Sequence, residues 1–379
     1  MKKPAIIWAN VILFAGTFLA TITLVPWYGL THGYSAPLWI ATVLCLGYCG
    51  MSITVGYHRL WAHKTFDAHP FVRFVLAIGG AFALQNSALH WSSDHRVHHR
   101  HVDHTEKDPY AAPKGFWYSH IGWMLREYQP LRYSDYSNCR DLQKDKIVMW
   151  QHKYYWRLTW ALNLGLPLLL GWALGDAIGG FLLIGVTRLV LSHHFTFFIN
   201  SLAHIWGKRT YTEKNSARDN GFLAFLTYGE GYHNFHHLFE YDYRNGIRWY
   251  QFDPSKWFIW TMNKLGLTRN LRTVPSERIL KAKLDLQKQR LETQLDLVEQ
   301  TEKMRESLQA EYDQMIEKML AFYAVRKRLF TLKKRKLSDT CQHELEELNE
   351  KLDSLKTAFQ QQQQRWQEIV SQVKGLQPA

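Results

Sequence analysis

The chain has 379 residues and a formal net charge of +13, and its length allows one large domain or two smaller ones. Aromatic residues make up 15% of it, which suits a membrane interface, and the 19 histidines suggest metal binding, because neutral imidazole is the commonest metal ligand. The four cysteines form no Cys-x-x-Cys pair, which argues against a zinc ribbon or a redox dithiol, and the apolar stretches described next argue against a nucleic-acid partner.

Four stretches are long and apolar enough to span a bilayer. They are residues 6–25, 37–56, 158–175 and 178–200, the last of which contains Arg188. A signal peptide is the competing interpretation of the first stretch, but no small-residue cleavage site follows it and a second apolar stretch comes soon after. We therefore predict an all-α integral membrane protein with four transmembrane helices arranged as two hairpins.

Loop charges predict the orientation of these spans. Residues 26–36 contain no lysine or arginine, and the short loop around Asp176 contains only that acid, whereas basic residues crowd the other segments. By the positive-inside rule, both termini and the large loops face the cytoplasm. Residues 57–157 and 201–270 then form a cytoplasmic helical cap, in which the apolar stretch 71–84 is too short to span and is expected to be a buried or interfacial helix.

Three tight histidine clusters lie in the predicted cap, and a further histidine follows the fourth span. The clusters and the single residue are His58 with His63, His95 with His98 and His99, His233 with His236 and His237, and His204. In His-x-x-His-His on a helix, the three side chains lie within one turn, and the adjacent pair points about 100° apart, so that one helix can serve two metals. His58 and His63 are five apart, about 140° off on an ideal helix, and require a helix end or two different metals.

Nine imidazoles are too many for one ion and suit two. Nitrogen ligation without sulfur favours iron, copper or zinc, but zinc has no redox chemistry and usually takes four ligands. The remaining histidines are not included in the ligand set. His32, His69, His90, His152 and His343 stand alone, His101 and His104 are expected to be exposed or to support ligands, and His193 and His194 lie within the fourth span.

The segment 271–379 differs in kind from the rest of the chain. Pro275-Ser276-Glu277 predicts a helix start, and a seam of apolar residues at alternating spacings of three and four predicts a coiled coil. The seam comprises Leu345, Leu348, Leu352, Leu355 and Phe359. A looser apolar stripe precedes it at residues 304–322, and residues 333–339 break the pattern. We predict a helical hairpin or an oligomerising coiled coil that serves as an interaction element without catalytic residues.

The order and spacing of the histidine clusters resemble those of the membrane fatty acyl desaturases of the stearoyl-CoA, or delta-9, type. The resemblance runs from the first span to about Leu267 and includes further motifs. These are Gln85-Asn86, Trp91, Asp94-His95, Asp108-Pro109, Gly115-Phe116, Asn200 to His204, and Gly229 to Tyr232. The chain is similar to a bacterial variant of that family with an added coiled-coil tail.

The resemblance implies a di-iron site with nine histidine ligands. It assigns His58, His99, His204, His233 and His237 to one iron, and His63, His95, His98 and His236 to the other, which Asn200 would also contact through a water. It implies that Gln85, Trp91 and Thr196 line the kink of a buried acyl tunnel. Asn86 and Asp94 match the substrate-binding positions of the family as well.

The chain departs from that pattern in two places. Ser93 stands where animal acyl-CoA desaturases have an arginine that contacts coenzyme A, and Phe197 replaces a tryptophan near the coenzyme. Coenzyme A, acyl carrier protein and phospholipid therefore all remain possible carriers of the acyl chain. No haem-binding domain is evident in the sequence, so an external carrier of the ferredoxin or haem cytochrome type is expected to supply electrons.

The resemblance thus implies O2-dependent insertion of a cis double bond, at the delta-9 position, in the cytoplasmic membrane of a bacterium rather than in the endoplasmic reticulum. A di-iron lipid hydroxylase is the alternative within the same chemistry. A metal transporter or a non-catalytic metal-binding membrane protein is the alternative from another class. A transporter would place histidines along its pore, whereas these cluster outside the spans.

Overall fold

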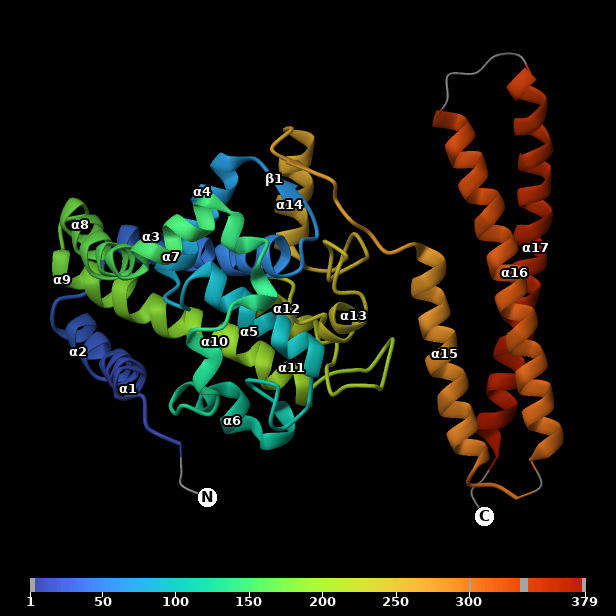
Figure 1. Cartoon of the computed structure of the whole chain (residues 1–379), viewed down its shortest axis with the longest axis horizontal. Coiled ribbons are helices and arrows are strands. Elements are labelled where there is room, and N and C mark those ends of the chain that lie inside the picture. Colours follow the sequence, from blue (N-terminus) through green and yellow to red (C-terminus); the bar gives the residue numbers. More distant parts are fainter. Residues whose placement is uncertain (1–3, 300, 335–339, 377–379) are drawn as a thin grey trace. The chain divides into compact units, whose positions relative to one another are not determined.

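The computed structural model describes residues 4–299, 301–334 and 340–376, and the chain divides into two compact units, Met1–Thr273 and Val274–Ala379 (Figure 1). The first unit is helical except for one antiparallel pair of two-residue strands in its described part, β1 (Asp67–Ala68) and β2 (Thr268–Arg269). The second unit contains only helices in its described residues.

Three helical segments of the described chain are long and apolar enough to cross a membrane: Trp8–Thr31, Ala36–Ala62 and Ala177–Ile205. They coincide with the first, second and fourth predicted spans. Their component helices are α1 (Trp8–Ile22) and α2 (Leu24–Thr31), α3 (Ala36–Met51) and the π-helix η1 (Ser52–Ala62), and α9 (Ala177–Gly180), the π-helix η8 (Phe181–Thr187), α10 (Arg188–Asn200) and α11 (Leu202–Ile205).

The predicted third span belongs to a longer helix that begins upstream of it. This helix is made of α7 (Lys146–Trp160), the π-helix η7 (Ala161–Gly165) and α8 (Leu166–Ala173). Its first half contains Lys153 and Arg157, and it is not among the three membrane-spanning candidates of the described chain. A fourth span therefore stays a prediction.

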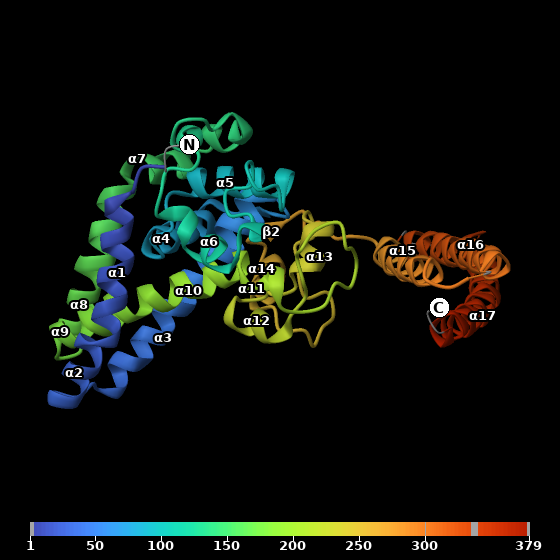
Figure 2. The same cartoon turned by 90° about the horizontal axis from the view of Figure 1, so that it is seen from below.

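The surface of these helices suits lipid rather than water. Ile12, Leu30 and Leu44 are 68%, 89% and 68% exposed, whereas the polar Thr42 and Arg188 are buried. Figure 2 shows α1, α3, α8 and α10 extending together from the cap. Apolar side chains outside and polar ones inside are the pattern expected of a membrane protein.

Arg188 is a charged residue within a predicted span, and buried acceptors accommodate it there. Its guanidinium donates hydrogen bonds to the carbonyl of Phe82 at 2.8 Å and to Oδ1 of Asn163 at 2.9 Å, and it lies 3.9 Å from the centre of the Phe82 ring. It thereby links α10 to α4 (Pro70–Phe82) and η7. The helix α4 corresponds to the predicted short apolar helix, and it buries Val72 and Leu76.

The cap is built from short helices joined by loops. Its α-helices after α4 are α5 (Ala88–His101), α6 (Phe116–His120), α12 (Gly221–Leu226), α13 (His233–Leu238) and α14 (Pro254–Lys264). Its 3-10 turns are η2 (Ala112–Lys114), η3 (Gly122–Met124), η4 (Pro130–Tyr133), η5 (Ser137–Cys139) and η6 (Leu142–Lys144). The Ser87 hydroxyl accepts a hydrogen bond from the backbone N–H of His90 and caps α5 at its N-terminus.

The second unit is a three-helix bundle of α15 (Ser276–Leu295), α16 (Glu302–Lys334) and α17 (Thr340–Gly375) (Figure 1). The predicted seam of α17 continues beyond Phe359, at the same spacing, to the buried Trp366 and Val373. The sequence predicted a hairpin or an oligomer, whereas α15 supplies a third helix that packs Leu284 and Leu291 into the same core. Residues 335–339, part of the predicted break, lie outside the described chain.

Candidate metal centre

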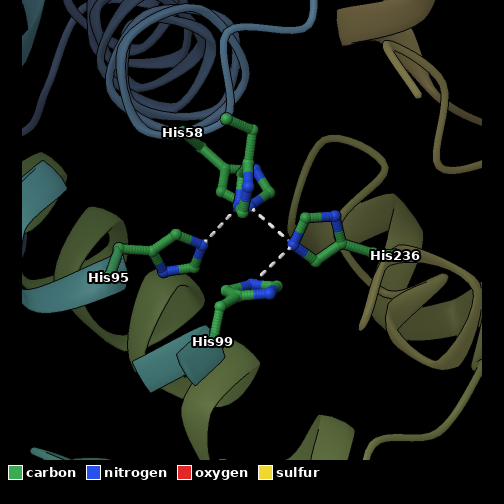
Figure 3. A group of neighbouring side chains, drawn as sticks. His58, His95, His99 and His236 are labelled. Atoms are coloured by element: carbon green, nitrogen blue, oxygen red, sulfur yellow. Dashed lines mark hydrogen bonds between the residues drawn. The ribbon is translucent and has the colours of Figure 1, made fainter. Parts of the chain in front are cut away.

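The nine predicted ligands converge in two groups. The five-histidine group comprises His58, His63, His95, His99 and His236, and the four-histidine group comprises His98, His204, His233 and His237. Within each group, one ring nitrogen per residue lies within 4.8 Å of all the others. In Figure 3, the labelled rings of four members of the first group, His58, His95, His99 and His236, lie on four sides of one centre.

This grouping differs from the division that the resemblance implied. His58 and His99 lie with His63 rather than with His204, and His98 lies in the other group. The reason is helical geometry, because residues four apart share a face. His95 and His99 therefore meet on α5, as do His233 and His237 on α13, and the middle histidine of each cluster turns to the other metal position. That one helix serves both positions agrees with the spacing argument.

The π-helix η1 accounts for how His58 and His63, which are five residues apart, reach the same group. Its hydrogen bonds join residues five apart, and the backbone N–H of His63 donates to the carbonyl of His58 at 3.0 Å. His63 is the first residue after η1. The wide turn and the helix end together place both rings in one group.

All the close nitrogen contacts between these rings join Nε2 atoms. In the five-histidine group they are His58 to His236 at 3.0 Å, His63 to His95 at 2.8 Å and His99 to His236 at 3.0 Å. In the four-histidine group they are His98 to His237 at 3.3 Å, His204 to His233 at 3.1 Å and His233 to His237 at 3.0 Å. Two unprotonated nitrogens repel each other at such distances, whereas a cation between them is stabilised by both lone pairs.

The opposite ring nitrogen, Nδ1, lies against an acceptor in several of these residues. The partners are Glu230 at 2.9 Å from His58, Asp108 at 2.9 Å from His98, Glu240 at 3.0 Å from His99, Tyr110 at 3.1 Å from His95, and Ser216 at 2.7 Å from His204. A carboxylate accepts a hydrogen bond from a protonated Nδ1, and the lone pair of the ring is then left on Nε2. Sequence motifs included Asp108 and Glu230, whereas no sequence signal connected Ser216 or Glu240 to the histidines.

Burial favours the neutral form of several candidate ligands. Loss of hydration, followed by the proximity of other histidines, lowers the pKa of His63, His95, His233, His236 and His237 well below its ordinary value. Burial also lowers the pKa of His99 to about 4, although Glu240 acts in the opposite direction. Neutral imidazoles with converging lone pairs suit a divalent transition metal, so the residues fit two such ions.

A buried ion-pair network supports the Glu230 carboxylate. Arg59 lies 2.9 Å from Glu230 and 3.0 Å from Asp253. Burial raises the pKa of Glu230, but Arg59 and His58 outweigh it and lower the pKa below its ordinary value. Gly229 precedes it with φ +105°, and a Cβ there would lie 2.4 Å from the Asp253 carboxylate. The glycine of the Gly229-Glu230 motif is thus required by backbone conformation and by space.

The predicted substrate residues divide into two sets. Gln85 donates a hydrogen bond to the Thr196 hydroxyl at 2.8 Å, and Trp91 stacks on His95 with ring centres 4.8 Å apart. Asp94 forms an ion pair with Arg132 at 2.6 Å. The side-chain amide oxygen of Asn86 accepts a hydrogen bond from the backbone N–H of Ser87. Asp94 and Asn86 are therefore occupied by contacts within the protein.

Two further residues bear on the site. Asn200 is the last residue of α10 and is half-buried, four positions before His204. Ser93 is 4% exposed, and its hydroxyl donates to Oδ1 of Asn138 at 2.8 Å. Ser93 thus faces the protein interior rather than a carrier at the surface.

A small apolar recess adjoins Thr196. It is lined by α3, η1, α10 and α12. Its wall includes Leu46, Phe195, Ile199 and Leu226. Such a lining suits hydrocarbon better than a polar ligand.

Comparison with known proteins adds independent findings. The family model described as fatty acid desaturase matches residues 35–262. The chain is 42% identical over 279 residues to a probable acyl-CoA desaturase of Schizosaccharomyces pombe, covering 72% of this chain and 56% of that protein. It is 37% identical to acyl-CoA desaturase 1 of Saccharomyces cerevisiae, covering 75% and 55%, and 35% identical to the sn-2 palmitoyl-lipid 9-desaturase of Nostoc, covering 73% and 94%. The chain thus spans about half the length of the two yeast relatives.

Proposed function

The chain belongs to the fatty acid desaturase family, and on that premise we propose that it inserts a cis double bond into a saturated fatty acyl chain at the delta-9 position. The observation that carries the proposal is the convergence of nine Nε2 donors in two adjacent groups. The name of the Nostoc relative, a palmitoyl-lipid 9-desaturase, supports the proposed position of the double bond.

Iron with O2 would supply the oxidising power to remove one hydrogen from each of two neighbouring methylenes, while two external electrons and two protons complete the reduction of O2 to two waters. The histidines would hold the two ions through Nε2. Glu230 and Asp108 would fix the ring tautomers of His58 and His98, and Asn200 is proposed to hold a water on one of the two ions.

Positioning of the acyl chain is assigned to the Gln85–Thr196 pair and Trp91. Trp91 stacks on His95, a member of the five-histidine group, and Thr196 borders the apolar recess. A chain passing between Trp91 and Thr196 would therefore run from the metal centre toward hydrocarbon-lined space. Held in that way, the chain presents one pair of methylenes to the metals. Asn86 and Asp94 would shape this region through their internal contacts.

We further propose the finer membrane arrangement. The helix from Lys146 to Ala173 would complete four spans, with both termini and the metal centre on the cytoplasmic side of a bacterial membrane. The match to the Nostoc enzyme over 94% of its length supports a bacterial setting. Electrons would come from a separate ferredoxin or haem cytochrome, and the second unit would bind a partner or another copy of the chain.

The decisive experiment combines metal analysis with lipid analysis. The protein is expressed in a host with a suitable electron donor and saturated lipids, and purified for iron determination. We expect about two iron ions per chain and new monounsaturated acyl chains. The His98→Ala variant should lose the product with its fold retained, whereas His104→Ala, outside both groups, should keep it.

Two outcomes would contradict parts of the proposal. Full occupancy by zinc with no change in host lipids would exclude the desaturase assignment. Hydroxylated acyl chains in place of unsaturated ones would indicate the hydroxylase alternative. Comparison of acyl-CoA, acyl carrier protein and phospholipid substrates with purified components identifies the carrier.

A further inference from the structure

Glu240 differs from the other groups that contact the histidines. It follows α13 by two residues, and its Oε2 atom lies 3.0 Å from Nδ1 of His99 and 3.8 Å from Nδ1 of His63. These two rings come from different elements, α5 and the end of η1, and both belong to the five-histidine group. One carboxylate therefore contacts two proposed ligands of the same metal.

The exposure of Glu240 separates it from the buried partners. Its side chain is 54% exposed, compared with 2% for Glu230 and 0% for Asp108. Glu230 is held by Arg59, and Asp108 accepts the backbone N–H of Tyr110. Within the described residues, the Glu240 carboxylate contacts the rings of His99 and His63.

We propose that Glu240 is a positioning residue for the five-histidine group, fixing the tautomer of His99 and the orientation of His63 so that both Nε2 atoms face the metal. The inference rests on the proposed function only in requiring that this group binds a metal ion. Without the carboxylate, the Nδ1 atom of His99 would face water, and the ring could adopt either tautomer or turn away. The four-histidine group should be unaffected, because Asp108 and Ser216 support its rings.

The test measures metal binding directly, with Co²⁺ alone as the probe. Metal-free full-length protein is titrated with Co²⁺, the ligand-field absorption is recorded, and release to a chelator is timed. The variants are Glu240→Ala, Glu240→Gln and the control Glu106→Ala, which removes another exposed carboxylate of the cap. Thermal unfolding of each metal-free protein is measured alongside.

We expect the wild type and the control to bind two ions. Glu240→Ala should weaken one of the two about 10- to 100-fold and speed its release, as is typical when a partner of a ligating histidine is removed. Glu240→Gln, whose amide oxygen still accepts the Nδ1 proton, should have a smaller effect. The unfolding temperature of the metal-free protein should not change.

Two results would overturn the inference. One is Co²⁺ binding by Glu240→Ala with both affinities and release rates of the wild type. The other is equal destabilisation of the metal-free protein, which would indicate a structural role. A wild type that binds two ions but yields no unsaturated product would contradict the proposed function and leave the Co²⁺ comparison to decide on Glu240. A wild type that binds fewer than two ions would contradict both.

Discussion

The groups that occupy Nδ1 determine which nitrogen each histidine turns toward the metal position. Ser216 provides a clear case, because its hydroxyl donates to Oδ1 of Asp103 at 2.5 Å and so must accept the Nδ1 proton of His204. The two hydrogen bonds therefore run in one direction, from His204 to Ser216 and from Ser216 to Asp103. The lone pair of His204 is left on Nε2, which faces His233.

Replacing Ser216 with alanine should weaken metal binding at the four-histidine group. The His204 ring loses its acceptor, and about a tenfold loss of affinity for one of the two ions is expected. Titration of the metal-free protein with Co²⁺ measures the effect, and the exposed Ser137→Ala serves as the control. Unchanged affinity at both positions would show that Ser216 does not fix the tautomer.

His120 should make stability depend on pH. Burial and the neighbouring His194 lower the pKa of His120 to about 4, whereas an unfolded chain has a value of about 6.5. Between these values the unfolded chain binds more protons, so stability should fall as pH drops from about 6.5 to about 4. His120→Gln should cost about 1 kcal/mol at pH 7.5 through weakened hydrogen bonds and make this decline shallower.

Unfolding temperatures of metal-free protein between pH 7.5 and 5 test this, with the exposed His343→Gln as the control. A decline equally steep in His120→Gln and the wild type would contradict it.

The identity of the candidate ligands was predictable, but their distribution was not. Spacing alone brings His95, His98 and His99 within one helical turn, so the cluster is visible in the sequence. Which metal position each ring serves depends on how α5 is rotated relative to η1 and α13, and that depends on packing across the cap. The contacts of Glu240 and Ser216 with the histidines could not be predicted from the sequence either, since they join loops to distant helices.

Among the elements, α10 shows how a polar residue ties membrane helices together. Arg188 donates to Asn163 of η7 and to the carbonyl of Phe82 at the end of α4. The hydrophobic pattern predicts α10 as a span and marks Arg188 as an interruption. The pattern does not identify the acceptors, because they lie on helices whose packing is set by the whole membrane unit. The start of α15 at Ser276 was predicted, but its packing as a third helix of the second unit was not, since that packing depends on contacts with α16 and α17.

Arg188→Met should destabilise the protein by roughly 2–4 kcal/mol, because Asn163 and the Phe82 carbonyl lose a buried donor. Adding Asn163→Leu should recover part of the loss, since the orphaned amide is removed as well. Thermal unfolding in detergent of the wild type, both single variants and the double variant measures the coupling. Strictly additive effects would show that the pair does not act as a unit.

At the scale of the whole molecule, the chain consists of two units with separate cores. All nine candidate ligands, the Gln85–Thr196 pair and the recess belong to the first unit. The sequence predicts a boundary after residue 270, because the amphipathic tail contrasts with the apolar, histidine-rich remainder. It did not predict a bundle rather than a hairpin, because bundle formation requires α15 to fold back on α16 and α17.

Deleting residues 274–379 should leave two bound metal ions and the double-bond product unchanged per folded chain. Metal analysis and acyl-chain analysis of the truncated protein test this. Loss of metal with the first unit still folded would show that the second unit supports the centre.

The isolated second unit should fold by itself around its buried Trp366, the single tryptophan of that segment. Fluorescence of that residue should report one cooperative unfolding transition, and a gradual change without a transition would contradict an independent core.

The distribution of the nine histidines along the chain also has a consequence for biogenesis. His58 is synthesised early and His237 much later, after the segments that enter the membrane, so neither metal position is complete until the ribosome has passed the third cluster. Metal bound at these positions would therefore link η1, α5, α11 and α13 only late in synthesis, once the third cluster has been made.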